Sequence, residues 1–256
     1  MLAEERRFRI REVLAVQRTV SASDLRDMLG VTAATIRRDL AALEEEGVLL
    51  RSHGGAVSRT SSTNFQPSYE ALAKTNPEAK QAIAREAEKL ILDGDTLFLE
   101  GSTTVFELVR RLQHHQRVTA VTNSPLIVCQ LQRCAGIKVM CIGGELQKDV
   151  FYLSGWWAQR ALAEIRVDKA ILGVSALDPV YGISTASQAE AQIKQTLLKI
   201  AKVRIGLVDH SKFGKQSFAH VGAASSLDVV VTDSGTNPTQ LDQLREMGVQ
   251  VIVAEN

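Results

Sequence analysis

The chain has 256 residues, of which 45% are hydrophobic and 23% are charged, and its formal net charge is +1 at pH 7. This composition excludes wholesale disorder, and the length favours a small domain followed by a medium-sized one. The net charge gives no overall sign of a nucleic-acid partner, but residues 1–60 contain ten arginines and no lysine. Arginine makes bidentate hydrogen bonds to phosphate and to the edge of guanine, so this bias mildly suggests nucleic-acid binding. Arginine-rich codon usage explains the bias about as well.

The sequence predicts neither a membrane-spanning segment nor a secreted protein. No stretch reaches the roughly 18 apolar residues that cross a bilayer, and the charged N-terminus lacks an apolar core. Three cysteines, Cys129, Cys134 and Cys141, are an odd number without the spacing of metal ligands. We therefore expect a cytoplasmic protein that holds no metal ion and no other cofactor.

Two helices are predicted at the start of the chain. Residues 4–17 place an apolar stripe near helical period, made of Phe8, Ile10, Val13 and Leu14. A second helix begins after Ser21, whose hydroxyl can cap its first turn, and it ends at Gly30. The side chains expected to be buried on this helix are Leu25, Met28 and Leu29.

A third helix and a hairpin follow. Thr32 can cap a helix that runs to about Glu46 and is ended by Gly47. Residues 48–59 contain two short apolar runs on either side of adjacent glycines, which predicts a β-hairpin. Three helices and a hairpin, with a short turn between the second and third helix, follow in the order of a winged helix-turn-helix domain.

The third helix has two distinct sides. At ~100° per residue, Ile36, Leu40 and Leu43 face the core. The opposite side presents Ala34, Arg38, Ala41, Ala42 and Glu45, flanked by Thr35 and Arg37. Small residues and cations in the first turns suit a helix that enters the major groove of DNA. Taken alone, the pattern is better explained as a solvated amphipathic helix, but the capped helix before it and the basic hairpin after it favour DNA binding.

Three glutamates end this helix, and in a groove they would repel DNA. Glu45 is on the same side as Arg38 but ~10 Å further along the axis, at 1.5 Å per residue. Glu44 and Glu46 point to the sides. We therefore expect the arginine end of the helix to face DNA and the acidic end to face away from it.

Beyond the hairpin the pattern changes twice. Residues 60–77 lose periodicity and gather Ser, Thr, Asn and Pro, which predicts a linker. Apolar runs suited to strands then alternate with helical stretches, which predicts an α/β domain with a doubly wound, mostly parallel sheet. The predicted strands are 96–99, 118–122, 138–142, 169–174, 204–208, 229–232 and 249–253, and the helices are 81–92, 103–112, 125–133, 156–164, 189–201 and 239–247. The predicted domains are thus 1–59 for DNA binding and 78–256 for effector binding and oligomerisation, joined by the linker 60–77.

Polar loops follow the ends of several predicted strands. The strand 96–99 runs into Gly101, Ser102, Thr103 and Thr104 at the start of a helix, where amides, hydroxyls and the helix dipole can bind an anion, although Ser102 could serve only as an N-cap. The other loops contain Thr122, Asn123, Ser124, Gly143, Gly144, Asp178 and Asp209 to Lys212. Ligands of doubly wound folds bind at the carboxyl ends of strands, so these loops can converge on one pocket, although each alone could be a solvated turn. Glu190 and Lys194 stand four residues apart and form either part of this site or a surface salt bridge worth roughly 0.3–0.5 kcal/mol.

Residues 4–59 resemble the DNA-binding domain of the DeoR family of bacterial transcriptional regulators. The resemblance rests on TIRRDL at Thr35–Leu40, on Leu43, Gly47 and Arg51, and on HGGA at His53–Ala56. It implies that Thr35, Arg37 and Arg38 contact bases and phosphates and that Arg51 and His53 contact the DNA backbone from the wing. Asp39 is expected to bond within the domain.

The segment from Lys80 to about Asp233 resembles the DeoR-family effector domain, which is similar in fold to ribose 5-phosphate isomerases. The matching stretches are KQAIAREA, GSTT, VTNS, IGGEL, VDKAILGVSALD and VDHSKFG. The resemblance implies that Lys80 and the loop Gly101–Thr104 hold the phosphate of a sugar. It makes Asp178, Glu190, Lys194, Asp209 and Lys212 candidates for contacting sugar hydroxyls or closing the pocket.

Two departures from these patterns bear on function. Glu100 is followed at once by Gly101, where the family has a spacer, so assignments in this loop can shift by one residue. Where the isomerases have paired aspartates, only Asp178 is present, and Ser175 stands at the other position. The loss of one carboxylate weakens an acid–base enzyme more than a binding protein.

We therefore expect a transcriptional regulator rather than an enzyme. It would repress carbohydrate metabolism genes, bind double-stranded operator DNA as a homodimer or homotetramer, and change its operator affinity when a phosphorylated sugar binds. One alternative is a sugar-phosphate isomerase with an appended DNA-binding domain. Another is a DNA-binding protein whose second domain only oligomerises.

Overall fold

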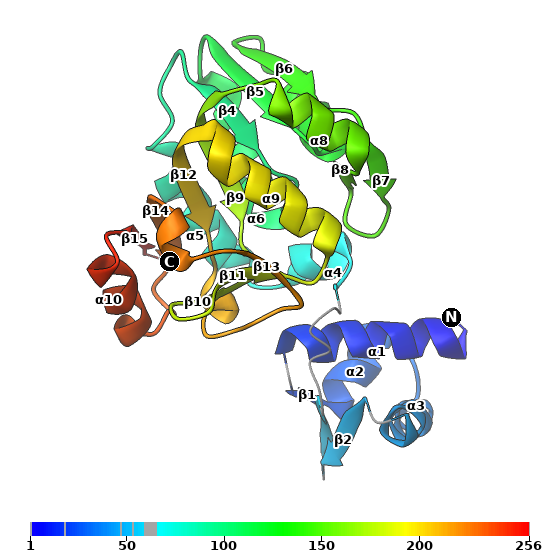
Figure 1. The fold of residues 1–256 in the computed structure, drawn as a ribbon. Helices are drawn as coiled ribbons and strands as arrows, with labels where there is room; N and C mark the ends of the chain where they lie inside the picture. The colour runs from blue at the N-terminus through cyan, green and yellow to red at the C-terminus, as the bar shows by residue number, and fades with distance from the viewer. Residues whose placement is uncertain (1, 18, 47, 53, 59–65, 256) are drawn as a thin grey trace. The chain divides into compact units, whose positions relative to one another are not determined.

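The computed structural model describes residues 2–17, 19–46, 48–52, 54–58 and 66–255. The chain forms two compact units, Met1–Thr75 and Asn76–Asn256, which are coloured in sequence order in Figure 1. Each unit has a hydrophobic core of its own. His53, a predicted DNA contact, lies outside the described residues, as do Gly47 and part of the predicted linker.

The first unit combines helices with a three-stranded antiparallel sheet of order β1-β3-β2. Its elements are α1 (Ala3–Gln17), β1 (Thr19–Ser21), α2 (Ala22–Leu29), α3 (Ala33–Glu45), β2 (Leu49–Ser52), β3 (Gly55–Ser58) and α4 (Tyr69–Lys74). The predicted order of three helices and a hairpin is confirmed. The strand β1 and the helix α4 were not predicted, and α4 lies within the segment expected to be a linker.

The predicted caps set the helix boundaries. Ser21 Oγ accepts a hydrogen bond from the backbone N–H of Asp24 at 3.0 Å, and Thr32 Oγ1 accepts one from Thr35 at 3.3 Å. Gly30 ends α2 in the left-handed region, with φ of 63°. Gly55 is constrained by space, because a Cβ there would lie 2.0 Å from the carbonyl oxygen of Val20 in the neighbouring β1.

The core of the first unit confirms the predicted inner face of α3. Ile36, Leu40 and Leu43 are all buried there. They pack with Ile10, Leu14, Val20, Leu25, Leu49 and Ala56. Two expected core residues were assigned wrongly: Phe8 is 47% exposed and Met28 is 54% exposed. Phe8 lies on the 15-residue α1 and Met28 on the eight-residue α2, and helical period alone did not decide their burial.

The second unit is built on a seven-stranded parallel sheet of order β15-β14-β12-β9-β4-β5-β6. Its strands are β4 (Thr96–Leu99), β5 (Val118–Thr122), β6 (Ile137–Cys141), β9 (Val167–Gly173), β12 (Ala201–Leu207), β14 (Val229–Asp233) and β15 (Gln250–Ala254). All seven coincide with predicted strands to within a few residues. The predicted fold class, a doubly wound and mostly parallel α/β sheet, is confirmed.

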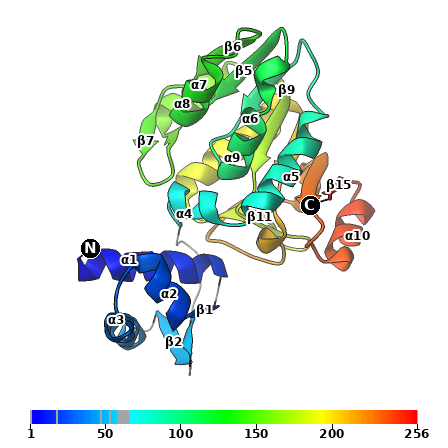
Figure 2. The ribbon, with the colours of Figure 1, turned by 180° about the vertical axis from the view of Figure 1, so that it is seen from behind.

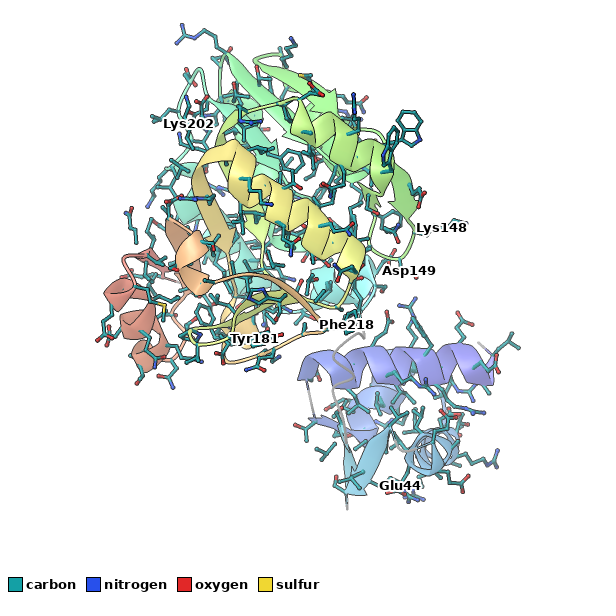
Figure 3. All side chains as sticks on the ribbon, in the orientation of Figure 1. Glu44, Lys148, Asp149, Tyr181, Lys202 and Phe218 are labelled. Carbon is teal, nitrogen blue, oxygen red and sulfur yellow. The ribbon has the colours of Figure 1, made fainter. Side chains whose placement is uncertain are left out.

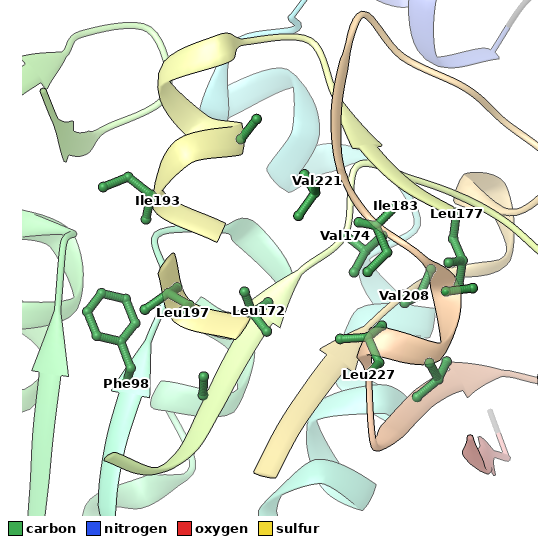
Figure 4. Close-up of a cluster of buried hydrophobic side chains, with 14 of the residues drawn as sticks. Phe98, Leu172, Val174, Leu177, Ile183, Ile193, Leu197, Val208, Val221 and Leu227 are labelled. Carbon is green, nitrogen blue, oxygen red and sulfur yellow. The ribbon is translucent and has the colours of Figure 1, made fainter. Parts of the chain in front are cut away.

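Helices cover both faces of this sheet, as Figures 1 and 2 show from opposite sides. One face carries α5 (Pro77–Glu88), α6 (Thr103–Val109) and α7 (Pro125–Leu131), and the other carries α8 (Trp156–Ala163), α9 (Gln188–Ile200) and α10 (Pro238–Glu246). Successive residues of β4 point to opposite faces, so Phe98 packs with Leu172 and Leu197 on the α9 side, as Figure 4 shows. Leu97 and Leu99 pack on the α5 side.

Several short elements of the second unit were not predicted. They are the hairpin β7 (Glu145–Gln147) and β8 (Tyr152–Ser154), the antiparallel sheet of β10 (Ala176–Asp178), β11 (Gly182–Thr185) and β13 (Ala219–Gly222), and the 3₁₀ turns η1 (Leu112–His114), η2 (His210–Lys212) and η3 (Ala224–Ser226). Each has only three or four residues, which is too short for a period to be recognised. Among the described residues, none of the helices combines the length and apolar character that a bilayer crossing needs.

The strand order places a topological switch point at the middle of the sheet. The chain goes outward from β4 to β5 and β6, then returns to β9 on the other side of β4 and continues to β12, β14 and β15. Where the connections from two neighbouring strands run in opposite directions, a crevice forms at the carboxyl ends of those strands. Ligands of doubly wound folds bind in this crevice. We therefore expect a ligand site among the residues that follow Leu99, Gly173 and Leu207.

Candidate functional sites

The outer face of α3 presents the residues predicted to read DNA. Arg37 and Arg38 are exposed, and Ala33 and Ala34 in the same turn are exposed as well. Across the part of the chain that the structure describes, neither arginine takes part in an ion pair. Thr35 is half-buried, and its hydroxyl lies 2.9 Å from that of the capping Thr32. The first turn and a half of α3 thus offers two unpaired cations over small side chains.

The acidic end of α3 is bound to neighbouring elements. Glu44, labelled in Figure 3, accepts a hydrogen bond from the backbone N–H of Arg51 at 2.9 Å, and the Arg51 guanidinium lies 3.9 Å from the same carboxylate. Glu46 forms ion pairs with Arg7, at 3.4 Å, and with Arg11 of α1. Two of the three glutamates therefore have cationic partners inside the unit. Arg51, the predicted wing contact, is oriented by Glu44.

Asp39 has the internal role that the sequence predicted. It is buried, and its carboxylate accepts hydrogen bonds from Arg6 Nε at 2.7 Å and from Arg6 Nη2 at 3.2 Å. Arg7 Nε lies 3.9 Å from the same carboxylate. Together with Arg11, these arginines join α1 to α3. The arginine bias of residues 1–60 therefore serves the packing of this unit as well as its exposed surface.

A buried charge cluster lies at the switch point of the second unit. Lys194 Nζ is 2.6 Å from Glu100 Oε1, 2.6 Å from the carbonyl oxygen of Gly173 and 3.2 Å from Glu190 Oε1. The other oxygen of Glu100 accepts a hydrogen bond from the backbone N–H of Gly173 at 2.9 Å. Ser175 Oγ donates to Glu190 at 3.2 Å. The cluster ties α9 to the carboxyl ends of β4 and β9.

This cluster excludes a surface salt bridge between Glu190 and Lys194. The Lys194 side chain is 2% exposed, and its three N–H donors are used by the three oxygen partners. Burial alone would lower the pKa of Lys194, but Glu100 and Glu190 together raise it above its ordinary value. Burial also raises the pKa of Glu100, against the opposing pull of Lys194. Lys194 is thus a charged internal crosslink, and Glu100, which was not predicted as a site residue, is its main partner.

The Ser/Thr loop after β4 is tightly packed. The backbone N–H of Gly101 donates to Asn123 Oδ1 at 2.9 Å, and Ser102 Oγ caps α6 by accepting from Val105 at 3.1 Å. Gly173 of β9 lies against this loop, because a Cβ there would come within 2.2 Å of Ser102 Oγ. Thr103 is half-buried and Thr104 is buried in the first turn of α6. The N-cap role of Ser102 is therefore real, and it fixes the loop at the switch point.

The loop after β5 supports its neighbours. Thr122 Oγ1 donates to the carbonyl oxygen of Leu99 at 2.6 Å, and Asn123 Nδ2 donates to that of Leu153 at 3.3 Å. Ser124 Oγ donates to the carbonyl oxygen of Phe151 at 3.2 Å. All three polar side chains are buried. They hold the β7–β8 hairpin and the Gly101 loop in place.

A second charge cluster lies after β12. Asp209 is buried and accepts hydrogen bonds from Asn76 Nδ2 at 2.9 Å and from the backbone N–H of Ser211 at 3.1 Å. Although burial would raise its pKa, Lys212, Ser211, Asn76 and Lys80 hold the pKa of Asp209 below its ordinary value. Burial lowers the pKa of Lys80 to about 8, against the attraction of Asp209. Two cations, Lys80 and Lys212, thus act electrostatically on one internal carboxylate that follows β12.

The remaining predicted residues have local structural roles. Asp178 Oδ1 accepts from the backbone N–H groups of Val180, at 2.9 Å, and Tyr181, at 2.8 Å, and so shapes the turn between β10 and β11. Gly143 and Gly144 are exposed in the loop before β7. Gly144 has φ of 143°, and a Cβ there would lie 2.5 Å from the carbonyl oxygen of Ser154.

Three residues of these clusters were not predicted as site residues, although the sequence around each of them has a feature that weakly indicates a special role. Glu100 is a carboxylate at the end of an apolar strand, Gly173 ends another apolar strand, and Asn76 stands directly before a proline that begins a helix. Their partners are distant in sequence: Glu100 is 94 residues from Lys194, and Asn76 is 133 residues from Asp209. No local pattern could have joined them.

Comparison with known proteins matches both units to described domain families. Residues 6–62 match the model described as a DeoR-like helix-turn-helix domain, and residues 75–234 match the DeoR C-terminal sensor domain. The HTH-type transcriptional repressor GlcR of Bacillus subtilis is 34% identical over 100% of this chain and 98% of its own length. The glycerol-3-phosphate regulon repressor of Escherichia coli K12 is 30% identical over 98% of this chain and 99% of its own length.

Among solved structures, a ribose 5-phosphate isomerase from Methanocaldococcus jannaschii is similar over 54% of this chain and 55% of its own. The sequence identity is 20% and the TM-score is 0.41. A likeness at this level supports no argument about activity. The full-length relatives are named as repressors, which does not favour the isomerase alternative.

Proposed function

This chain belongs to the DeoR family of transcriptional regulators, and we propose that it represses genes of carbohydrate metabolism until a phosphorylated sugar binds to its second unit. It is a DNA-binding regulator rather than an enzyme, in keeping with relatives of the same length that are named as transcriptional repressors. The observation that most supports an anionic effector is the pair of lysines, Lys80 and Lys212, around Asp209 at the carboxyl end of the parallel sheet.

The proposed DNA contacts are those of α3 and the wing. Arg37 and Arg38 would reach base edges and phosphates in the major groove, with Thr35 beside them. Arg51 and His53 would contact the DNA backbone from the hairpin. The exposure of both α3 arginines and the internal pairing of Glu44 and Glu46 support this assignment.

The proposed effector site lies at the carboxyl ends of β4, β9 and β12. Lys80 and Lys212 would bind the phosphate, with Gly101, Ser102, Thr103 and Thr104 lining the site beside them. Lys80 is mostly protonated at pH 7, since its pKa is about 8. One relative is named as the repressor of a glycerol-3-phosphate regulon, which supports a small phosphorylated polyol or sugar as ligand.

The other predicted effector residues divide into contacts and supports. We assign sugar-hydroxyl contacts to Glu190 and Asp178, and a positioning role to Lys194, whose donors are already used. Thr122, Asn123 and Ser124 would shape the site by bracing the Gly101 loop, and Gly143 and Gly144 would let the β7–β8 hairpin approach it.

We also infer a homodimer or homotetramer that acts in the cytoplasm, where operator DNA is found. Trp156 and Trp157 at the start of α8 are 65% and 67% exposed, with their ring centroids 4.6 Å apart. Large exposed aromatic surfaces favour protein contacts. Sedimentation of the wild type and of a Trp156→Ser/Trp157→Ser variant tests this surface, and an unchanged oligomer in the variant would exclude it.

A thermal-shift screen of the full chain against sugar phosphates tests the effector. A true ligand at a hundredfold excess over its Kd should stabilise the protein by ~2.7 kcal/mol, and the matching unphosphorylated sugar should not. The same ligand should change the affinity for a DNA duplex selected by the protein from a random pool. Stabilisation by none of the sugar phosphates would contradict the proposal, and turnover of a pentose phosphate would restore the isomerase alternative.

A further inference from the structure

The junction between the two units contains an unusual residue. Asn76 is the first residue of the second unit and lies directly before α5, with φ of 48° and ψ of 49°. This left-handed conformation is uncommon outside glycine, and asparagine tolerates it better than most residues. An asparagine at this position normally caps its own helix, but the Asn76 side chain makes no such bond. Its amide instead donates to Asp209 Oδ1 at 2.9 Å.

On the other side of the junction, α4 is firmly attached to the DNA-binding unit. The backbone N–H of Ser68, the N-cap of α4, donates to Glu12 Oε1 of α1 at 2.9 Å. Glu12 is buried, and its second oxygen lies 3.1 Å from Arg9. The helix also packs against α1. At its end, Thr75 bonds back to the carbonyl oxygens of Leu72 and Ala71, at 3.2 and 2.9 Å.

These contacts belong to the first unit and reach to its last residue, Thr75. From Ser68 to Thr75 the backbone is held by α1 and by its own helical bonds, and the next residue is Asn76. A change in the backbone at Asn76 would therefore act directly on the chain that joins α4 to α5. Because α4 contacts α1, a change at this point would be passed on to the unit that contains α3.

Asp209 has two roles at this point. It is the acceptor of the Asn76 amide, at 2.9 Å, and it is the negative charge whose pKa Lys212 and Lys80 lower. An anion bound by these lysines would stand beside Asp209 with a charge of the same sign. Like charges repel strongly in a buried site, so anion binding and the present position of Asp209 compete.

We propose that the Asn76–Asp209 hydrogen bond is a latch through which effector binding changes the affinity for operator DNA. A bound phosphate displaces the Asp209 carboxylate, the Asn76 amide loses its acceptor, and the left-handed backbone at the junction relaxes. This inference rests on the proposed function, because it takes the anion at Lys80 and Lys212 to be the effector. It assigns to Asn76 a positioning role rather than a contact with the ligand.

Two substitutions of Asn76 test the latch while they leave the proposed phosphate-binding lysines unchanged. Asn76→Gly keeps the left-handed backbone accessible and removes the amide. Asn76→Asp keeps the shape of the side chain but sets a carboxylate against Asp209, which should open the latch without ligand. Asn237→Asp is the matched control, since Asn237 caps α10 through its carbonyl oxygen alone, by accepting from Thr239 at 3.0 Å. Circular dichroism and thermal melting check that each full-length variant is folded.

The readouts are thermal stabilisation by the sugar phosphate that the screen selects and Kd for the selected DNA duplex, with and without that ligand. In the wild type and in Asn237→Asp, the ligand should change this Kd by about 5- to 150-fold, the usual range of coupling between sites. In Asn76→Gly the ligand should still stabilise the protein, but the change in Kd should fall below about threefold. In Asn76→Asp the Kd without ligand should lie within about threefold of the liganded wild type.

A full wild-type response in folded Asn76→Gly would overturn the latch. So would an unchanged ligand-free DNA affinity in Asn76→Asp, and this second measurement needs no effector. Should no sugar phosphate stabilise the wild type, the proposed effector fails, and inorganic phosphate at tens of millimolar replaces it as the probe. The ligand-free DNA affinity of Asn76→Asp then tests the latch without any effector.

Discussion

Replacing Lys194 with methionine should destabilise the second unit strongly, because the methionine fills the same space and removes the cation between two buried carboxylates. Glu100 loses its contact at 2.6 Å and Glu190 its contact at 3.2 Å. Breaking a buried ion pair by removing one partner costs ~3–5 kcal/mol. A unit of this size loses ~2–4 °C of Tm per kcal/mol, so Tm should fall by ~6–20 °C.

The loss should depend on pH in a defined direction. Burial already raises the pKa of Glu100, and without Lys194 nothing of opposite charge opposes that rise. A carboxyl whose pKa is higher in the folded than in the unfolded chain stabilises the fold while protonated, and this stability is lost as the pH rises through the folded-state value. Lys194→Met should therefore be closer to the wild type at pH 5 than at pH 8.

Urea unfolding of the full chain at both pH values measures this effect. Lys199→Met, an exposed lysine on the same helix, is the control and should change stability by no more than ~0.5 kcal/mol. Adding Glu100→Gln to Lys194→Met should recover part of the loss, because it removes one unpaired charge. A cost below ~1 kcal/mol that is equal at pH 5 and pH 8 would refute the assignment of Lys194 as a charged internal crosslink.

Three further predictions concern the DNA contacts and the site. Arg38→Ala should weaken operator binding by ~1–3 kcal/mol and relax the preference at one base pair, as measured by fluorescence anisotropy on duplexes with single changes. Unchanged affinity would remove Arg38 from the interface. Gly173→Ala should cost ~1–3 kcal/mol in urea unfolding, because the new Cβ would lie 2.2 Å from Ser102 Oγ. A variant as stable as the wild type would show that the Ser102 loop can yield. Sugar-phosphate affinity should fall as the pH rises through about 8, where Lys80 loses its proton, and Lys80→Arg should flatten this dependence in calorimetry. An unchanged pH dependence of the affinity in Lys80→Arg would show that another group titrates.

The parallel sheet could be predicted from the sequence because each of its strands is a separate apolar run between helical stretches. Segments such as Thr96–Leu99 and Val118–Thr122 were placed without error at either end. The hairpin β7–β8 and the β10–β11–β13 sheet could not be predicted, since their strands are too short to show alternation. The pairing of β11 with β13 also depends on residues far apart in the chain, such as Ser184 and His220.

The sequence predicted which residues belong to the candidate site better than it predicted which side chains contact one another. Lys80, Ser102 and Asp209 were recognised from motifs and positions after strands, and all three lie at the carboxyl edge of the sheet. What each side chain binds depends on the strand order, which brings β9 beside β4 and so Gly173 beside Glu100. The Glu190–Lys194 spacing suggested a surface pair as readily as a buried one, because helical spacing does not reveal which face of a helix is covered.

The division of α3 into an exposed first half and an anchored second half has a consequence for how such proteins diversify. Asp39, Glu44 and Glu46 join this helix to α1 and to β2, whereas Arg37 and Arg38 have no partner among the described residues. Substitutions at the exposed Ala33, Ala34, Arg37 and Arg38 therefore leave the buried Ile36 and the contacts that hold the helix unchanged. If these side chains read bases as proposed, the target preference of such a domain can change through a few exposed positions without a change in its core.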